Sequence, residues 1–302
     1  MFCKNCGQPY VTDQAVMCVK CGAQKGVGNN YCPNCGQPLK KDGRTFCCPK
    51  RHSFDIAAAG YCNLLLSPRS GDKVGDDKQM VAARRRFLDR GYYQPLADAV
   101  CERVSSILSK PSVVIDAGCG EGYYTRQLAE RLDTDGLLAQ MIGIDISKSA
   151  TQYAAKRDAR TQYITASTYQ MPIAPHRADL VVSLFAPTPA QEFSRVLCPD
   201  GAVLCVVPGE MHLWELKCAV YDTPYRNRED KHRLDGFVLD DCMHVEYTVT
   251  IDRAGDIRTL FAMTPYSHRT PAEGKRRLEA LESLTVTLSF ALLTFRPEQE
   301  SV

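Results

Sequence analysis

The stretch "VVIDAGCGEGYYT", residues 113–125, decides the fold of this chain. An apolar run rich in β-branched residues ends at Asp116, and Gly118, Gly120 and Gly122 follow before a segment with helical spacing. Glycines let the backbone approach a ligand closely, and a helix N-terminus offers unpaired amide donors. A dinucleotide site would read G-x-G-x-x-G, whereas here the third glycine comes one position early. This form predicts that Asp116, Gly118 and Gly120 bind S-adenosylmethionine, which has no pyrophosphate.

The segments around this loop alternate between two patterns. Short apolar runs recur in the order "SVVIDAG", "MIGIDIS", "QYITAS", "DLVVSLF" and "AVLCVVP", and helix-like segments separate them. This rhythm is typical of a parallel sheet with helices on both faces. We therefore expect an α/β fold of the Rossmann-like class, with a doubly wound, mostly parallel, seven-stranded sheet preceded by small zinc-binding modules.

Three further features follow the glycine loop in the order expected for a methyltransferase. Asp145 ends the next strand, where a carboxylate can accept both hydroxyls of a ribose. Ser167 follows the third strand, where such folds often touch the adenine edge. The run "FSRVLCPDGAVLCVVPG" then has the helix, turn and strand of the far end of the sheet. Together these features favour a class I S-adenosylmethionine-dependent methyltransferase over a nucleotide fold that has lost its activity.

Composition bears on the partners and the cellular location of the protein. The chain has 302 residues and a formal net charge of +2, so contact with nucleic acid must come from local basic patches. The start "MFCKNCGQPY" has neither the basic nor the apolar region of a secretory signal. The run "LTVTLSFALLTF" is too short to span a bilayer. We expect a soluble, cytoplasmic protein without a membrane partner.

The cysteines are concentrated at the N-terminus. Of fifteen cysteines, eight fall within the first 48 residues, and six of those form C-x-x-C pairs. Because a secreted context is absent, the pairs indicate metal ligands and not disulfides. Two pairs complete one tetrahedral zinc site, whose predicted ligands are Cys3, Cys6, Cys18 and Cys21.

A second zinc site begins with the third pair, Cys32 and Cys35. His52 supplies a third ligand, and spacing alone allows either Cys47 or Cys48 as the fourth. Four protein ligands leave no open position for water, so both sites are expected to be structural. Basic residues surround the second site, and they suit either phosphate contact or a solvated charged face: Lys40, Lys41, Arg44, Lys50 and Arg51.

These patterns divide the chain into four parts. Residues 1–30 are the first four-cysteine ribbon, and residues 31–66 are the second zinc module, to which we assign RNA recognition. Residues 67–80 are polar, rich in Gly and Asp, and predict a linker. Residues 81–302 form the methyltransferase domain.

The loop after the fourth predicted strand bears on the methyl acceptor. Exocyclic amine transfer usually shows an Asn/Asp-Pro-Pro-aromatic loop, and "LFAPTP" lacks the polar first residue. Phe185 and Pro187 can instead flank a flat acceptor such as a base. Cys198 lies in a turn before a strand, so we interpret it as structural and not as a nucleophile.

The chain resembles the 23S rRNA (guanine-N1)-methyltransferase family over roughly residues 31 to 297. The motifs that carry this resemblance include "YCPNCGQPL", "CPKRHSFDIAAAGYCNLL", "AARRRFLDRGYYQPL", "VIDAGCGEGYYT", "APTPAQEFSRVLCPDG", "PGEMHLWELK" and "LFAMTP". The resemblance implies that Cys48 is the metal ligand. It further implies cofactor contacts at Tyr93, Gly120, Glu121 and His212.

The resemblance also implies a reaction and its partners. The expected reaction is methylation of N1 of a guanine in a hairpin loop of domain II of 23S rRNA, by a homodimer. No residue is assigned as the proton acceptor. Candidate RNA surfaces are the second zinc module, the "ARRRF" helix (residues 83–87) and "YRNREDKHR" (residues 225–233).

One feature departs from the family, whose pattern begins near residue 31: the ribbon at residues 3–21 is an addition. Two other functions remain as alternatives. One is a methyltransferase that acts on a small molecule or a protein. The other is a non-catalytic zinc-ribbon adaptor that binds RNA or protein.

Overall fold

The computed structural model describes residues 27–65, 75–227, 233–264 and 266–298. The first predicted zinc site, at residues 3–21, lies outside the described residues. Within the described residues, two sheets organise the chain: a small N-terminal sheet of four strands and a large sheet of eight. No helix among these residues is long and apolar enough to cross a membrane.

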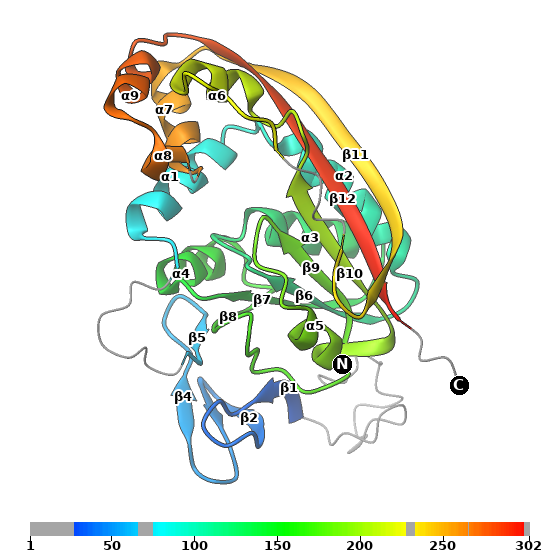
Figure 1. The fold of residues 1–302 in the computed structure, drawn as a ribbon. Coiled ribbons are helices and arrows are strands. Elements are labelled where there is room, and N and C mark those ends of the chain that lie inside the picture. The colour runs from blue at the N-terminus through cyan, green and yellow to red at the C-terminus, as the bar shows by residue number, and fades with distance from the viewer. Residues whose placement is uncertain (1–26, 66–74, 228–232, 265, 299–302) are drawn as a thin grey trace.

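The large sheet has the strand order β11-β12-β10-β9-β6-β7-β8-β5. Its strands pair in parallel from β5 to β10, and β12 and β11 pair antiparallel at the other end. The strands are β5 (Cys62–Asn63), β6 (Ser112–Ala117), β7 (Ala139–Asp145), β8 (Gln162–Thr165), β9 (Ala178–Leu184), β10 (Leu197–Pro208), β11 (Phe237–Ile251) and β12 (Leu284–Pro297). This is the expected mostly parallel architecture with one strand more than the expected seven, because β5 joins its edge (Figure 1).

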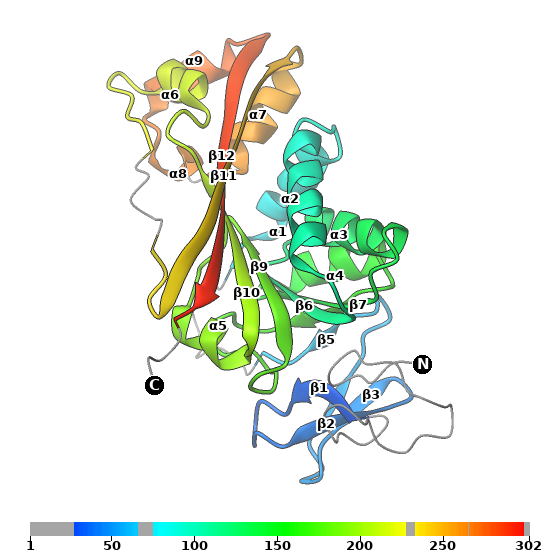
Figure 2. The same cartoon turned by 90° about the vertical axis from the view of Figure 1, so that its right-hand side faces the viewer.

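Helices cover both faces of the large sheet, which is therefore doubly wound (Figure 2). Successive residues of β6 point to opposite faces: Val114 belongs to the core on one side, whereas Val113 and Ile115 belong to the core on the other. The helices of this part are α1 (Lys78–Leu88), α2 (Gln94–Ile107), α3 (Tyr123–Thr134), α4 (Lys148–Arg157) and α5 (Ala190–Val196). All residues of β6 are buried, as expected for a central parallel strand.

The small sheet has the order β1-β2-β3-β4 and is antiparallel. Its strands are β1 (Val27–Tyr31), β2 (Pro38–Asp42), β3 (Thr45–Cys47) and β4 (Ser53–Asp55). Buried residues of this sheet, among them Leu39 and Phe46, share one hydrophobic core with Phe193 of α5. The amide of Tyr31 also donates to the carbonyl of Pro172, at 2.8 Å. The N-terminal sheet is thus packed against the large sheet.

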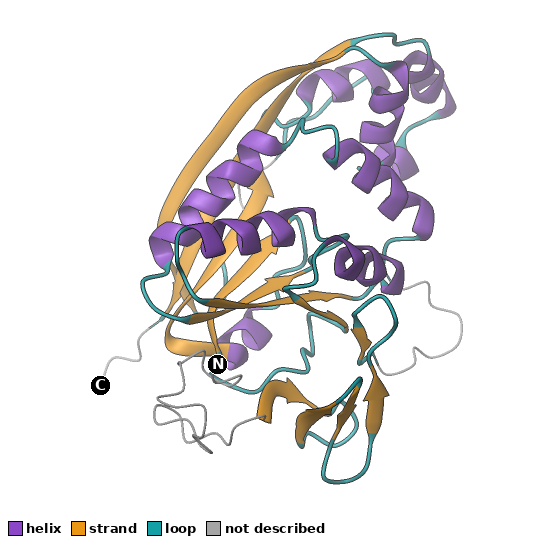
Figure 3. Ribbon diagram, turned by 180° about the vertical axis from the view of Figure 1, so that it is seen from behind, coloured by secondary structure: helices purple, strands orange, loops and turns teal. Residues whose placement is uncertain are grey.

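A third group of helices lies at the far end of the long β11–β12 pair (Figure 3, and top of Figure 1). We call this group the helical cap. It consists of α6 (Trp214–Val220), α7 (Ala254–Ala262), α8 (Tyr266–Arg269) and α9 (Ala272–Glu279). Because β11 and β12 continue beyond the parallel strands, they hold the cap across from the carboxyl ends of those strands.

The two strands at the centre of the large sheet, β6 and β9, are neighbours although β7 and β8 lie between them in the chain. The chain leaves these strands in opposite directions, and ligands of such sheets bind at the carboxyl ends of the strands at this position. Gly118, after β6, has φ +91°, and a Cβ there would lie 2.4 Å from Cβ of Ala186, after β9. Only glycine lets the two loops approach this closely.

Candidate active site

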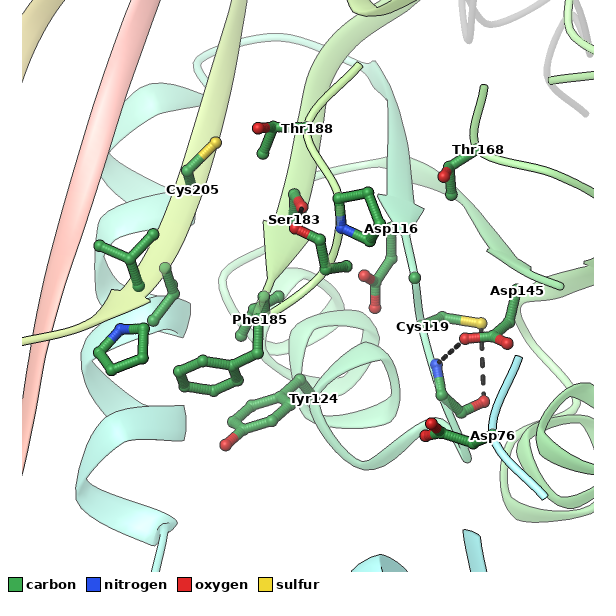
Figure 4. Close-up of a pocket in the computed structure, with 18 of the residues that line it drawn as sticks. Asp76, Asp116, Cys119, Tyr124, Asp145, Thr168, Ser183, Phe185, Thr188 and Cys205 are labelled. Atoms are coloured by element: carbon green, nitrogen blue, oxygen red, sulfur yellow. Dashed lines mark hydrogen bonds between the residues drawn. The ribbon is translucent and has the colours of Figure 1, made fainter. Parts of the chain in front are cut away.

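A large cleft opens between the carboxyl ends of the strands and the helical cap, with a volume of about 1210 Å³. All eight residues predicted to bind the cofactor line it: Tyr93, Asp116, Gly118, Gly120, Glu121, Asp145, Ser167 and His212. They come from positions that span 120 residues of sequence (93 to 212). The structure therefore brings the predicted set together in one cleft, and Figure 4 shows two of its members, Asp116 and Asp145.

Asp145 ends β7 and is held by backbone amides. Its Oδ2 accepts a hydrogen bond from the amide of Gly120 at 2.9 Å, and its Oδ1 accepts one from the amide of Ser147 at 2.8 Å. Each carboxylate oxygen has a second lone pair, which stays available to a ribose hydroxyl. The carboxylate is thus oriented before any ligand binds.

Asp116 ends β6 at the base of the cleft and is fully buried. Its Oδ2 accepts from the hydroxyl of Thr125 at 2.6 Å, whereas its Oδ1 has no hydrogen-bond partner. The pKa of Asp116 is raised to about 7, chiefly by burial and also by the charges of Asp145 and Glu121, while the hydrogen bond from Thr125 opposes the shift. A cation in the cleft would give Oδ1 the partner that it lacks and would stabilise the ionised carboxylate.

Glu121 adds a third buried carboxyl group, and its Oε1 has no hydrogen-bond partner. Burial raises the pKa of Glu121, although the Arg157 guanidinium, 3.9 Å from Oε1, opposes this shift. One side of the cleft therefore carries the carboxyl groups of Asp116, Glu121 and Asp145, and we call it the acidic side. S-Adenosylmethionine carries a sulfonium and an ammonium group, so this donor set fits it.

Tyr93 and His212 are also buried and line the cleft. Their ring centroids lie 6.4 Å apart, and both rings pack on Phe290 of β12. The amide of Ser289 donates to Nδ1 of His212 at 3.4 Å, which leaves the proton on Nε2. Burial, assisted by the charge of Lys217, lowers the pKa of His212 to about 3. His212 is thus a neutral hydrogen-bond donor and not a general base at neutral pH.

Phe185 follows β9 and lines the cleft with 45% of its surface exposed. Its φ of +56° lies in the left-handed region, which is rare for an aromatic residue. Strained residues of this kind cluster at functional sites. Its ring packs on that of Phe290, with centroids 5.6 Å apart, and Figure 4 shows it at the end of the cleft away from Asp145. An exposed aromatic ring here can contact a flat acceptor.

Several residues that line the cleft were not predicted from the sequence. Arg84, which belongs to one of the candidate RNA surfaces, lines the cleft and pairs with Asp76. Tyr225 and Tyr266 also line it, and the buried Lys217 lies beneath both rings. A lysine inside the apolar run "HLWELKCAV" was the available signal, since a lysine is almost never fully buried without partners.

The N-terminal sheet carries a second constellation, which consists of Cys32, Cys35, Cys48 and His52. Their ligand atoms all lie within 4.8 Å of one another, and Cys47 is not among them. Sγ of Cys35 and Sγ of Cys48 are 3.7 Å apart, and Nδ1 of His52 lies 3.4 Å from Sγ of both Cys32 and Cys48. A tetrahedral zinc ion with bonds of about 2.3 Å to sulfur separates two sulfurs by about 3.8 Å, so the set fits zinc.

Local backbone geometry forms this constellation. The amide of Gly36 donates to the carbonyl of Cys32, and Gly36 has φ +66°. The amide of Arg51 donates to the carbonyl of Cys48, and Arg51 has φ +65°. Both turns fold a pair of ligands toward the same point. The basic residues around them are exposed: Lys40, Lys41, Arg44, Lys50 and Arg51.

The comparisons with known proteins first give the class. Residues 114–201 match the family described as "Methyltransferase domain", and residues 31–67 match the zinc-ribbon family described as "RlmA, N-terminal". The protein is a methyltransferase of the S-adenosylmethionine-dependent fold with an N-terminal zinc ribbon, which confirms the predicted fold class.

The relatives then give the particular family. The 23S rRNA (guanine(748)-N(1))-methyltransferase of Streptomyces fradiae is 33% identical over 264 residues, which cover 84% of this chain and 91% of that protein. A Micromonospora griseorubida protein, assigned provisionally as a 23S rRNA (guanine-N(1)-)-methyltransferase, is 34% identical over 279 residues, with coverage of 84% and 91%. The chain belongs to the 23S rRNA (guanine-N1)-methyltransferase family.

Other relatives share only part of the chain. A malonyl-[acyl-carrier protein] O-methyltransferase of Halorhodospira halophila is 30% identical over 165 residues, which cover 49% of this chain and 55% of that protein. The family assignment therefore rests on matches that span most of the chain, including its zinc ribbon.

Proposed function

We propose that the protein transfers a methyl group from S-adenosylmethionine to N1 of a guanine in 23S rRNA. Family membership over 84% of the chain carries this proposal. The cleft supports it, because one side has the charge that suits the cofactor and the opposite side has exposed aromatic rings that suit a base.

We assign the cofactor site to the acidic side of the cleft. Asp145 would accept the ribose hydroxyls, and Ser167 would contact the adenine edge. Asp116 and Glu121 would face the cationic methionine end, close to the Gly118–Gly120 turn. Tyr93 and His212 would also contact the cofactor, with the Nε2 proton of His212 as donor.

When bound, the cofactor supplies an electrophilic methyl group on sulfur. The N1 lone pair of guanine forms the new bond to this carbon, the bond from carbon to sulfur breaks with its electron pair left on sulfur, and the N1 proton passes to water. The protein contributes position: it holds the base unstacked and in line with the methyl group. The neutral His212 is not the proton acceptor, since its burial opposes protonation.

We propose that Cys32, Cys35, Cys48 and His52 hold one zinc ion. The ion would cross-link a segment too short to build a large core, and it would take no part in the chemistry. Residues 31–66 with their exposed basic residues would then recognise RNA, and residues 81–302 would catalyse. The predicted linker, residues 67–80, would join them, although its last three residues already belong to α1 (Lys78–Leu88). The additional ribbon at residues 1–30, with its own zinc ion, would extend this contact.

The target that we propose is a guanine in a hairpin loop of domain II. Single-stranded loops let bases splay out, whereas the grooves of duplex RNA hide them. We further expect the enzyme to work in the cytoplasm, where the rRNA is, and as a homodimer. Sedimentation of the purified protein would test the homodimer, and a monomer at micromolar concentration would refute it.

Primer extension tests the reaction directly. The purified protein is incubated with S-adenosylmethionine and unmodified 23S rRNA, and reverse transcriptase is run across domain II. Because N1 methylation blocks Watson-Crick pairing, we expect one enzyme-dependent stop next to the modified guanine. If no stop appears while calorimetry shows cofactor binding, the acceptor is a different molecule.

A further inference from the structure

The cleft is larger than one ligand requires. Its volume of about 1210 Å³ exceeds the range of roughly 300–1,000 Å³ that is usual for a drug-sized ligand. The acidic side accounts for the cofactor. Part of the remaining lining comes from the helical cap and from the segment that follows α6, and it includes Tyr225, Asn227 and Tyr266. No role has yet been assigned to Tyr225, Asn227 or Tyr266 individually, and we call the part of the cleft that they line the second side.

Tyr225 is the most exposed ring on the second side, with 49% of its surface exposed. Lys217 of α6 is completely buried, and its Nζ lies 4.6 Å from the centroid of the Tyr225 ring. The same Nζ donates to the carbonyl of Tyr225 at 3.1 Å and lies 5.4 Å from the Tyr266 ring centroid. Since Lys217 is buried and Tyr225 lines the cleft, the ammonium group supports the ring from the protein side.

A second set of bonds anchors the same segment. Nζ of Lys217 donates to Oδ1 of Asn227 at 2.6 Å, and Nδ2 of Asn227 donates to the carbonyl of Gly209 at 2.8 Å. The amide of Asn227 donates to the carbonyl of Glu210 at 3.1 Å. Gly209 and Glu210 immediately precede His212, so the segment that carries Tyr225 is tied to the turn that carries His212. The ring is therefore held in place before any substrate binds.

We propose that Tyr225 is the stacking platform for the unstacked target guanine, and that Lys217 is the positioning residue that holds this ring. This inference rests on the proposed function and names the part of the cleft that receives the acceptor. Aromatic side chains stack on unpaired bases in many RNA sites, because every base has a π-face. The purine would lie against Tyr225 with N1 directed toward the acidic side, where the methyl group is supplied.

The contacts of Lys217 explain how the cap accommodates a buried lysine. A buried ammonium is costly unless its hydrogen-bonding capacity is met, and here two oxygens and two ring faces meet it. Burial lowers the pKa of Lys217, so the site tolerates the charge at a cost in stability. A shorter or apolar side chain would fill the core without fixing the ring. Preorganisation of the acceptor site is the gain that offsets this cost.

Tyr225→Ala and Tyr225→Trp test the platform. Base–aromatic stacking predicts that Tyr225→Ala lowers kcat/KM for 23S rRNA about 5- to 100-fold, with most of the loss in KM for RNA. The cofactor Kd, measured by calorimetry, should be unchanged. Tyr225→Trp should retain near wild-type kcat/KM, because an indole also offers a stacking face. If Tyr225→Ala methylates as the wild type does, the proposal is overturned; if it weakens cofactor binding, Tyr225 belongs to the cofactor site instead.

Lys217→Met and the double variant test the positioning role. If Lys217 acts through the ring, Lys217→Met lowers kcat/KM for RNA, whereas adding it to Tyr225→Ala changes nothing further. Fully additive losses would show that Lys217 acts elsewhere. Should Lys217→Met fail to fold, the comparison of Tyr225→Ala with Tyr225→Trp still tests the stacking platform. A wild-type protein without any primer-extension stop would refute the proposed function itself, which separates that failure from failure of the platform.

Discussion

At the scale of single residues, the free protein holds an arrangement that is unfavourable without its ligand. Asp116 and Glu121 are both almost completely buried, and each has a carboxyl oxygen without a hydrogen-bond partner. Proteins rarely leave such atoms unsatisfied, because each costs about 1–3 kcal/mol. The cost is understandable if a cation occupies the cleft during catalysis. If the cofactor binds as proposed, these two residues are the ones at which folding stability and cofactor binding are in conflict.

Asp145→Ala tests the ribose contact. We expect the cofactor Kd to rise about tenfold or more, because hydrogen bonds to a charged acceptor contribute about 1.5–3 kcal/mol. Calorimetry measures the affinity. Asp240→Ala is the control, since Asp240 lies on β11, where it forms an ion pair with the exposed Arg296. Equal affinities in both variants would remove Asp145 from the cofactor site.

Asp116 predicts a specific dependence of stability on pH. Burial raises its pKa to about 7, whereas an unfolded aspartate titrates near pH 4. Between these values the folded protein binds the extra proton, so this group makes the cofactor-free protein less stable as pH rises from about 4 to about 7, with no further change above. Asp116→Asn removes the effect. We expect its stability gain over the wild type to be small near pH 4 and to reach at most about 4 kcal/mol at pH 8.

Urea unfolding at several pH values measures this gain. A difference between Asp116→Asn and the wild type that is the same at pH 4 and pH 8 contradicts the raised pKa. The same residue should release protons when the cofactor binds near neutral pH, because a neighbouring cation favours the ionised carboxylate.

At the scale of elements, the two central loops determine the shape of the cleft. The loop after β6 and the loop after β9 touch at Gly118 and Ala186, and this contact sets the distance between the acidic side and Phe185. Neither loop is long, so small displacements of one strand end would move both ligand sites. The close approach depends on the absence of one Cβ atom.

Gly118→Ala tests this contact, and Gly136→Ala is its matched control. Both glycines flank α3 and have positive φ, +91° and +68°, but a Cβ at Gly136 meets nothing within 4 Å. Gly136→Ala should therefore cost only the left-handed backbone strain of about 1–2 kcal/mol. Gly118→Ala should cost more, and it should also weaken cofactor binding because the loops must separate. Equal losses of stability with intact cofactor binding would show that the contact has no role.

At the scale of the whole molecule, the N-terminal sheet is an integral part of the protein. The residues just after it form β5, which pairs with β8 at the edge of the large sheet, and its metal-ligand cysteines Cys32 and Cys48 lie in a core shared with the large sheet. The segment at residues 171–173, which follows Ser167, is hydrogen-bonded to the N-terminal sheet, but it is also held by α5. Glu192 and Arg195 of α5 bind its backbone at Met171 and Ile173.

Cys48→Ala tests whether the N-terminal sheet and the cofactor site function independently, with Cys47→Ala as the adjacent control. Loss of one ligand should release zinc and abolish binding of 23S rRNA, because the basic residues lose their scaffold. The cofactor Kd should be retained, since α5 still holds residues 171–173. Cys47→Ala should keep its zinc and bind both ligands. Loss of cofactor binding in Cys48→Ala would mean that the ribbon supports the whole fold.

Much of this arrangement is encoded locally and was predictable. The strand rhythm, the glycine turn after Asp116 and the acidic end of β7 depend on neighbouring residues, because β-branched runs, tight turns and strand ends are short-range features. The C-x-x-C pair and the Cys48–His52 turn are short-range too. The resemblance to a family supplied Tyr93 and His212, which local pattern alone would have assigned to packing.

The sequence by itself determined the class of fold, the edge of the sheet at which the predicted cofactor residues gather, and the residue types of the zinc ribbon. Only the tertiary structure decided that β5 extends the sheet, that Arg84 turns inward to Asp76, and that the buried Lys217 lies beneath the Tyr225 ring. These contacts join elements whose relative placement depends on the packing of the entire chain. A local pattern cannot specify them, because the partner of each side chain is set by the fold.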